Sequence, residues 1–193
     1  MSFNKAQLQA IAHKKGPCMV LAGPGSGKTT VITNRIEHLI QKCKVKPEEI
    51  LVITFSKAAS KEMRERFHAL NPAQHYPVTF RTFHGIYYGI LKWAYNINAS
   101  NIFTEDEKYQ LLYQVIEQLG LALDDEKEFI QDLASEISNV KNNQIPLLEY
   151  QAVSCEDTIF RKIYETYENQ RKGRRKIDFD DMLVLTHQLF VNR

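Results

Sequence analysis

The sequence predicts an α/β fold, in which a parallel sheet carries a phosphate-binding loop and an all-helical subdomain is inserted into the α/β unit or appended to it. Over the first 85 residues, short apolar segments alternate with amphipathic helical segments, as parallel strands alternate with their connecting helices. A glycine-rich loop lies between the first of these strands and a long helix. From about residue 86 to residue 171 the periodicity is helical only.

Length and composition set broad limits on this chain. Its 193 residues, 44% of them hydrophobic, suffice to bury the core of one or two domains. Its 25 basic and 23 acidic residues nearly balance, so composition alone does not indicate nucleic-acid binding. Cys18, Cys43 and Cys155 are far apart and form no CxxC pair, which favours thiols of a reducing cytosol over a zinc site. No segment approaches the roughly 18 apolar residues of a membrane span, so we expect a cytoplasmic protein without a membrane partner.

The first element in the chain order is a short apolar strand at residues 18–22, which leads into a phosphate-binding loop. The glycines of this loop let consecutive backbone N–H groups point at phosphate oxygens, and the helix N-terminus adds a favourable dipole. Lys28 would reach the β- and γ-phosphates, and the Thr29 hydroxyl would bind Mg²⁺. The predicted phosphate-contacting residues are Ala22, Gly23, Pro24, Gly25, Ser26, Gly27, Lys28, Thr29 and Thr30. Ala22 replaces the glycine of the strict pattern, which is tolerable at the end of a strand.

Two more strands complete the predicted sheet. They occupy residues 50–55 and 78–83, with a helix over residues 58–70 between them. The continuous apolar run at residues 50–53 is typical of a strand that is covered on both faces. We expect the phosphate site at the carboxyl ends of these strands.

Helices alone are predicted in the middle of the chain. Thr104 and Glu107 form a capping box ahead of an amphipathic helix that Gly120 ends. A second helix carries apolar residues from Phe129 to Val140, and a third carries them from Ile159 to Tyr167. The basic run at residues 171–176 fits either a phosphate grip or a solvated surface.

An acidic residue for hydrolysis is missing from the pattern. A nucleoside triphosphatase with this loop needs a carboxylate at the end of another strand, and no apolar strand here ends in Asp-Glu. Asp180 and Asp181 precede a helix, which favours helix-capping carboxylates over a metal site. We therefore expect a chain that binds a nucleotide with Mg²⁺ but does not turn it over, and that ends before the acidic motif of a larger protein.

Several further segments carry a family resemblance. They occur in the order Phe3-Asn4-Lys5-Ala6-Gln7, the loop from Ala22 to Thr30, Ile53-Thr54-Phe55-Ser56-Lys57-Ala58-Ala59-Ser60-Lys61-Glu62-Met63, Arg81-Thr82-Phe83-His84-Gly85 and Asp178-Phe179-Asp180-Asp181-Met182-Leu183. Together they resemble the N-terminal part of the UvrD/Rep/PcrA superfamily-one DNA helicases. The resemblance implies a P-loop, RecA-like ATP-binding core at residues 1–86, a helical insertion at 87–175 and a return to the core at 176–193.

The resemblance also implies an activity and its partners. Enzymes of this family use ATP and Mg²⁺ to move 3′ to 5′ along single-stranded DNA and to unwind duplexes, so single strands, single-to-double-strand junctions and a second RecA-like domain are the expected partners. A helicase-nuclease subunit of the RecB or AddA type is the nearest variant. A non-catalytic ATP-binding module and a small P-loop kinase are the rival classes.

The resemblance assigns roles to individual residues. Gln7 would contact the adenine edge, although Asn4 and Gln7 also have the spacing of a capping box. Arg35 would lie beside the base, with a solvated helix arginine as the alternative. The expected DNA-contacting residues are Thr54, Phe55, Ser56, Lys57, Thr82, Phe83, His84 and Phe179. Hydroxyls and a lysine suit phosphates, and an aromatic ring can stack on a base.

Overall fold

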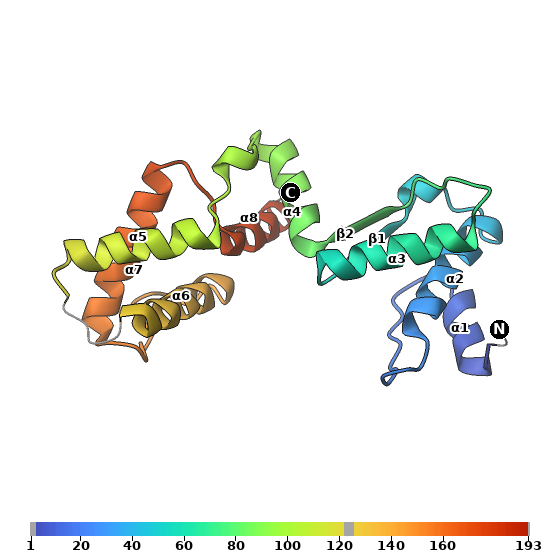
Figure 1. The fold of residues 1–193 in the computed structure, drawn as a ribbon, viewed down its shortest axis with the longest axis horizontal. Coiled ribbons are helices and arrows are strands. Elements are labelled where there is room, and N and C mark those ends of the chain that lie inside the picture. Colours follow the sequence, from blue (N-terminus) through green and yellow to red (C-terminus); the bar gives the residue numbers. More distant parts are fainter. Residues whose placement is uncertain (1–2, 122–125, 193) are drawn as a thin grey trace. The chain divides into compact units, whose positions relative to one another are not determined.

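Helices and one small parallel sheet make up the structure, a computed structural model that describes residues 3–121 and 126–192 (Figure 1). The chain divides into two compact units, Met1–Gly85 and Ile86–Arg193. Each unit has its own hydrophobic core. Within the described residues, no helix has both the length and the apolar character needed to cross a membrane.

Unit 1 contains the sheet and the helices that flank it. Its elements are α1 (Lys5–Ala12), α2 (Lys28–Gln41), the 3-10 turn η1 (Pro47–Glu49), β1 (Leu51–Thr54), α3 (Lys57–Leu70) and β2 (Thr79–Thr82). β1 and β2 pair in parallel, with Leu51 opposite Thr79 and Thr54 opposite Thr82. The structure confirms the two later strands and the helices around them, although each strand is shorter than its predicted range.

The core of unit 1 lies on one face of this sheet. Phe67 of α3 is fully buried against Phe80 of β2, with their ring centroids 5.8 Å apart. Val52 points into the same core, whereas Leu51 and Ile53 on the other face of β1 are exposed. The prediction that residues 50–53 are covered on both faces is therefore wrong, because the described helices cover one face only.

The predicted strand at residues 18–22 is absent from the described sheet. These residues have no regular secondary structure, and Met19 and Leu21 are 85% and 89% exposed. A strand needs a neighbour whose backbone completes its hydrogen-bond ladder. β1 and β2 pair with each other, and neither pairs with this segment. The described sheet therefore has two strands where the sequence predicted three, and a complete RecA-like sheet is not seen.

Unit 2 is helical. It contains most of α4 (Phe83–Tyr95), the 3-10 turn η2 (Ala99–Asn101), α5 (Glu105–Gln118), α6 (Glu126–Asn142), α7 (Asp157–Gly173) and α8 (Phe179–Val191). The structure confirms the capping box of Thr104 and Glu107 at the start of α5. Gly120 follows α5 with a φ of 65°, the left-handed conformation expected of a helix-ending glycine.

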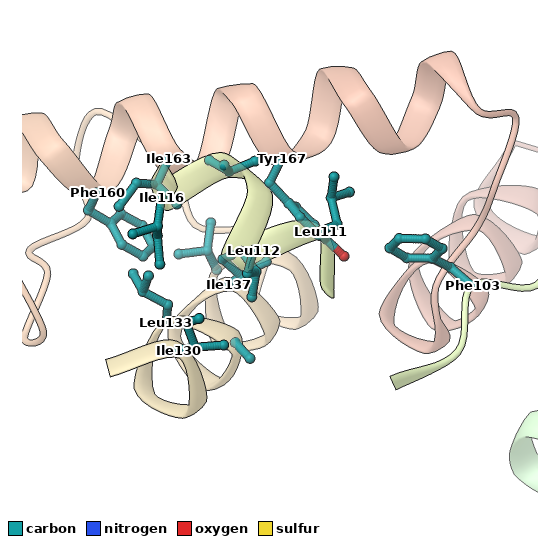
Figure 2. Packing of buried hydrophobic residues seen from close by; sticks show 13 residues of the cluster. Phe103, Leu111, Leu112, Ile116, Ile130, Leu133, Ile137, Phe160, Ile163 and Tyr167 are labelled. Carbon is teal, nitrogen blue, oxygen red and sulfur yellow. The ribbon is translucent and has the colours of Figure 1, made fainter. Parts of the chain in front are cut away.

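The core of unit 2 lies between α5, α6 and α7, whose apolar faces point toward one another (Figure 2). Leu111 and Leu112 of α5, Leu133 and Ile137 of α6 and Ile163 of α7 have no exposed surface. Such residues recur every three or four positions along each helix, as the sequence pattern predicted. The three predicted helices thus bury the faces that their periodicity indicated.

Backbone hydrogen bonds join the segment that precedes α5 to the segment that precedes α8. The backbone N–H of Phe103 donates to the carbonyl of Ile177 (2.7 Å), and the N–H of Ile177 donates to the carbonyl of Asn101 (2.8 Å). The chain therefore enters the α5–α7 bundle and leaves it at the same place. Residues 176–193 belong to unit 2 in this division. Their return to the nucleotide-binding core stays a prediction.

Candidate nucleotide-binding site and DNA-facing edge

The glycine-rich loop turns directly into the N-terminus of α2. Gly25 and Gly27 have φ values of 72° and 80°, which residues with side chains rarely adopt. The Ser26 hydroxyl donates to the carbonyl of Gly23 (2.8 Å) and closes the turn. α2 has Gly27 as its N-cap and no acidic residue in its first turn. Because no capping side chain is present, the first N–H groups and the dipole of α2 are suited to an anion.

Lys28 places its ammonium at this loop. Its Nζ donates to the carbonyl of Gly23 (2.7 Å) and to that of Ala22 (3.3 Å). The side chain is exposed, and the half-buried Thr29 follows it in the first turn of α2. The structure thus brings Lys28 and Thr29 together at the N-terminus of α2, as the motif predicts for phosphate and Mg²⁺ contacts.

Gln7 connects α1 to the same loop. Its backbone N–H and its Oε1 complete the capping box with Asn4, at 2.9 Å each. Its Nε2 also donates to the carbonyl of Ser26 (3.1 Å). The capping interpretation is therefore confirmed, and the same amide binds the loop. Sequence reasoning missed this second contact because it joins residues 19 positions apart.

Arg35 also ties α2 to α1. Its Nη1 donates to the carbonyl of Ala10 (3.0 Å) and to the carbonyl of His13, at the end of α1. The side chain is half-buried, so it is not the freely solvated arginine of the alternative interpretation. A cation at this position also interacts favourably with the C-terminal carbonyls of α1.

A cavity of about 570 Å³ brings several of the predicted residues together. The predicted residues that line it are Gln7, Ala22, Gly23, Ser26, Lys28 and Arg35. The apolar side chains of Val31 and Ile32 form part of its wall. The remaining predicted residues of the loop and helix start, Pro24, Gly25, Gly27, Thr29 and Thr30, do not line it. A volume of this size, with a few polar groups on an apolar lining, is typical of a small-molecule site.

The carboxyl ends of β1 and β2 form one edge of the sheet. Thr54 and Thr82 are paired residues, so the segments that follow them leave the sheet side by side. The Ser56 hydroxyl accepts from the N–H of Ala59 (3.1 Å) and caps α3. Phe55 is 94% exposed, which excludes the core position that was its alternative.

The second segment at this edge starts α4. The Thr82 hydroxyl accepts from the N–H of Gly85 (3.2 Å), and Phe83 and His84 are exposed. Lys57 is exposed at the start of α3. Two helix N-termini, two aromatic rings and two basic side chains therefore gather at the sheet edge that also carries Thr54 and Thr82. Phe179, by contrast, lies in unit 2 as the half-buried first residue of α8.

The acidic segment at residues 178–181 forms the start of α8, as predicted. Asp178 and Asp181 form a capping box, with hydrogen bonds of 3.0 and 2.8 Å. Basic side chains from other helices hold its carboxylates: Lys108 lies 3.2 Å from Asp180, and Lys141 lies 2.6 Å from Asp178. These ion pairs were not predicted, since sequence periodicity carries no signal for contacts between distant helices.

The basic run at residues 171–176 includes a buried member. Arg171 is buried, and its Nη2 lies 2.7 Å from Glu168. Burial opposes the guanidinium charge, but the hydrogen bonds to Glu168 and the nearby aspartates outweigh it and raise the pKa of Arg171. Lys176 pairs with Glu107 at 3.1 Å. Arg171 therefore fits neither of the two alternatives for this run, because it is committed to internal ion pairs.

Comparison with known proteins assigns the family. The family model of the UvrD/REP helicase N-terminal domain matches residues 3–193. The chain belongs to this family. It is 36% identical over 192 residues to the ATP-dependent DNA helicase Rep of Escherichia coli and 35% identical over 198 residues to the ATP-dependent DNA helicase PcrA of Leuconostoc citreum. It is also 34% identical over 209 residues to the putative ATP-dependent DNA helicase YjcD of Bacillus subtilis.

These matches cover almost all of this UvrD/Rep-family chain but only part of its relatives. They include 96% of the chain and 28% of Rep, 97% of the chain and 26% of PcrA, and 100% of the chain and 26% of YjcD. The chain thus spans between a quarter and a third of the length of these helicases. The recognition made from the short motifs is confirmed over the full match.

Proposed function

We propose that this chain is the ATP-binding N-terminal part of a cytoplasmic, ATP-dependent DNA helicase that moves 3′ to 5′ on single-stranded DNA and unwinds duplexes. The single observation that carries the proposal is the glycine loop at the N-terminus of α2, with Lys28 at its mouth, in a chain of the UvrD/Rep family. The relatives Rep and PcrA are named ATP-dependent DNA helicases, which supports the extension to this chain.

In the proposed nucleotide site, the loop N–H groups and Lys28 bind the phosphates, and Thr29 binds Mg²⁺. Lys28 donates to the carbonyls of Gly23 and Ala22, so its ammonium already lies at the loop before any phosphate arrives. A phosphate oxygen competes with these neutral carbonyls and gains from its own negative charge. Arg35 lies in the wall of the same cavity and contributes a positive charge beside the base.

Gln7 is suited to the adenine edge because its amide has a fixed orientation. The N–H of Asn4 requires an oxygen at Oε1, and the carbonyl of Ser26 requires a donor at Nε2. Each amide atom retains one further hydrogen-bonding position. Adenine offers a donor at N6 and an acceptor at N7, which match these positions, whereas guanine offers two acceptors. We therefore propose that Gln7 favours ATP over GTP.

The proposed DNA surface is the sheet edge after β1 and β2. Ser56 and Thr82 lie near the helix N-termini with their hydroxyls, and Lys57 and His84 supply positive or hydrogen-bonding groups for phosphates. Thr54, also expected to contact DNA, is buried, and its hydroxyl donates to the carbonyl of Ser56 (3.0 Å). Phe55 and Phe83 offer exposed rings on which bases can stack. Phe179 is proposed as a further contact from unit 2, and the second RecA-like domain of the family is proposed as the partner that completes the motor.

We further propose that the chain alone does not hydrolyse ATP. β1 ends at Thr54 and β2 at Thr82, so neither described strand ends in a carboxylate that could polarise an attacking water. The acidic residues at the start of α8 are paired with Lys108, Lys141 and Arg171. Helicase activity belongs, in this proposal, to a protein of the length of Rep or PcrA.

Binding of fluorescent oligo-dT, measured by anisotropy together with phosphate release, tests this function. We expect saturable binding, no steady phosphate release, and about a tenfold loss of DNA affinity in Phe55→Ala, since base stacking contributes roughly 1–3 kcal/mol. Tyr113→Ala, which removes a partly exposed ring from α5, is the matched control and should bind normally. Equal DNA affinity in Phe55→Ala and wild type, or steady turnover by the chain alone, would contradict the proposal.

A further inference from the structure

α1 forms one wall of the proposed nucleotide cavity but has little apolar packing of its own. Ala6, Gln7 and Ala10 line the cavity. Of the 8 residues of α1, Ile11 is the buried one, and Leu8 is 52% exposed. An isolated helix of this length is not stable in water, because few hydrogen bonds form for the entropy lost in its first turn. The position of α1 therefore depends on its contacts with the rest of unit 1.

Polar contacts hold α1 near both of its ends. In its first turn, Gln7 Nε2 donates to the carbonyl of Ser26 in the phosphate loop (3.1 Å). At the other end, Arg35 Nη1 donates to the carbonyl of Ala10 (3.0 Å) and to the carbonyl of His13, the C-cap residue. The last carbonyls of a helix lack partners within it, so a guanidinium there satisfies them and interacts favourably with the helix dipole. Arg35 therefore fixes the end of α1 that Gln7 does not reach.

The chemistry of the two bases separates a positioning role of Arg35 from a direct contact with the base. Arg35 is half-buried and lines the same cavity as Gln7. A guanidinium that hydrogen-bonds a base edge favours guanine, whose N7 and O6 both accept, over adenine, which has one acceptor and one donor there. The Gln7 amide, with an acceptor and a donor, matches adenine instead. A direct contact and a contact through Gln7 therefore predict opposite effects of Arg35 on base selection.

We propose that Arg35 is a positioning residue for base selection, which holds α1 against α2 so that the Gln7 amide lies at the adenine edge. This inference rests on the proposed nucleotide site. A short helix held at one end can tilt, whereas contacts at Ser26 and at Arg35 fix its direction. Phosphate binding does not need the Arg35 contact, because the loop and Lys28 lie at the start of α2. Arg35 therefore acts on the base and not on the phosphates.

Competition titration with the Mg²⁺ complexes of ATP, GTP and tripolyphosphate tests this role in wild type and Arg35→Met, which keeps an unbranched apolar side chain and removes the donors. We expect ATP affinity to fall about tenfold and the preference for ATP over GTP to shrink, with tripolyphosphate affinity changed by less than about twofold. Lys42→Met, which removes an exposed basic side chain at the other end of α2, should bind all three as wild type does. Equal losses for ATP and tripolyphosphate, or a stronger preference for ATP, would overturn the proposal.

A double-mutant cycle tests whether Arg35 acts through Gln7. In a Gln7→Ala chain the amide that reads adenine is already absent. Arg35→Met should then change the preference for ATP over GTP by less than about twofold, because coupled side chains have non-additive effects. The same change in both backgrounds would show an independent contact with the base and would overturn the proposal.

Hydrogen exchange tests the unmodified chain, and it decides the question even if Arg35→Met does not fold. Mg²⁺–ATP should slow exchange of the α1 amides by at least about threefold, whereas tripolyphosphate should slow exchange in the loop and the start of α2 only. A chain that binds ATP without protection of α1 would overturn this inference and leave the nucleotide site in place. A wild-type chain that binds neither ligand would overturn the nucleotide site and, with it, the role of Arg35.

Discussion

Two side chains of unit 1 each join two segments of the chain. The Gln7 amide caps α1 and holds the carbonyl of Ser26 in the phosphate loop, while Arg35 links α2 to the last carbonyls of α1. α1 is thereby joined to the phosphate loop through Gln7 and to α2 through Arg35. Sequence patterns present capping and ligand contact as alternatives for Gln7, yet an amide with four hydrogen-bonding positions can satisfy both.

This coupling predicts a defect in nucleotide selection for Gln7→Glu. The glutamate keeps an acceptor for the N–H of Asn4 but loses the donor for Ser26 and for adenine N7. We expect ATP affinity to fall by about tenfold, and the preference for ATP over GTP to shrink, because a carboxylate near a triphosphate also adds repulsion. Competition titration with a fluorescent nucleotide measures both quantities. Gln9→Glu, an exposed change on the same helix, is the control; an ATP preference equally intact in both variants would refute the role of Gln7.

Some helices of this chain begin with a capping box, and α2 begins without a capping side chain. α1, α5 and α8 begin with capping boxes in which side chains satisfy the first N–H groups, and these starts were predictable from Asn4, Thr104 and Asp178. α2 begins at Gly27, which has no side chain, after a loop rich in glycine. Capped starts stabilise the fold, whereas the start of α2, which has neither a capping side chain nor an acidic residue in its first turn, is suited to an external anion.

The α5 cap allows a simple test of this distinction. Thr104→Ala removes the hydroxyl that accepts from the N–H of Glu107 (3.2 Å) and dismantles the capping box. We expect the free energy of unfolding to fall by about 1 kcal/mol. Urea denaturation followed by circular dichroism measures this loss. Thr158→Ala, at an exposed position in α7, should cost much less; the same cost in both variants would contradict the capping argument.

Helices were easier to predict than the sheet, for a physical reason. The amphipathic pattern of α5, α6 and α7 is local, and their buried faces follow directly from it. A strand depends on a neighbour, so residues 18–22 remain outside the sheet although they are as apolar as β1. The ion pairs around Lys141 were equally out of reach, because they join α6 to α7 and α8.

The site was predictable where a motif fixes the backbone. Glycines and Lys28 in the loop fix the phosphate cradle, and Thr54 and Thr82 lie at strand ends whose register places them together. The link from Gln7 to Ser26 and the link from Arg35 to α1 follow from tertiary packing, which no local pattern encodes.

At the scale of the whole molecule, the two units depend on different interactions. Unit 1 relies on a small aromatic and aliphatic core around Phe67 and Phe80, whereas unit 2 combines a larger apolar core with buried ion pairs. Burial disfavours ionisation of Glu168, Asp178 and Asp180, but the partners Arg171, Lys141 and Ser138 outweigh it and lower the pKa of these carboxyls. Asp181 shifts in the opposite direction, because burial and the charge of Asp178 raise its pKa.

The lowered pKa values of Glu168, Asp178 and Asp180 predict that unit 2 loses stability in acid. A carboxyl whose pKa is lowered by folding stabilises the folded state at pH values above its ordinary pKa, which is 4.5 for Glu and 3.8 for Asp. This stabilisation is lost as the pH falls below that pKa. Asp181 offsets part of the loss, since its raised pKa favours the folded state at lower pH. We expect the free energy of unfolding to fall by at least about 2 kcal/mol between about pH 5 and pH 3. Urea titrations at several pH values check this, and stability that does not change over that range would contradict it.

Isothermal titration of Mg²⁺–ATP into the wild-type chain and into Lys28→Ala tests whether the glycine loop before α2 binds the nucleotide. Lys28 is exposed, so its removal should leave the fold intact, and circular dichroism verifies this. We predict saturable one-to-one binding to wild type and at least about a tenfold weaker binding to the variant, equivalent to about 1.4 kcal/mol. Lys42→Ala, at the other end of α2, should bind as wild type does. Equal ATP affinity in wild type and Lys28→Ala would contradict the assignment of this loop as the nucleotide site.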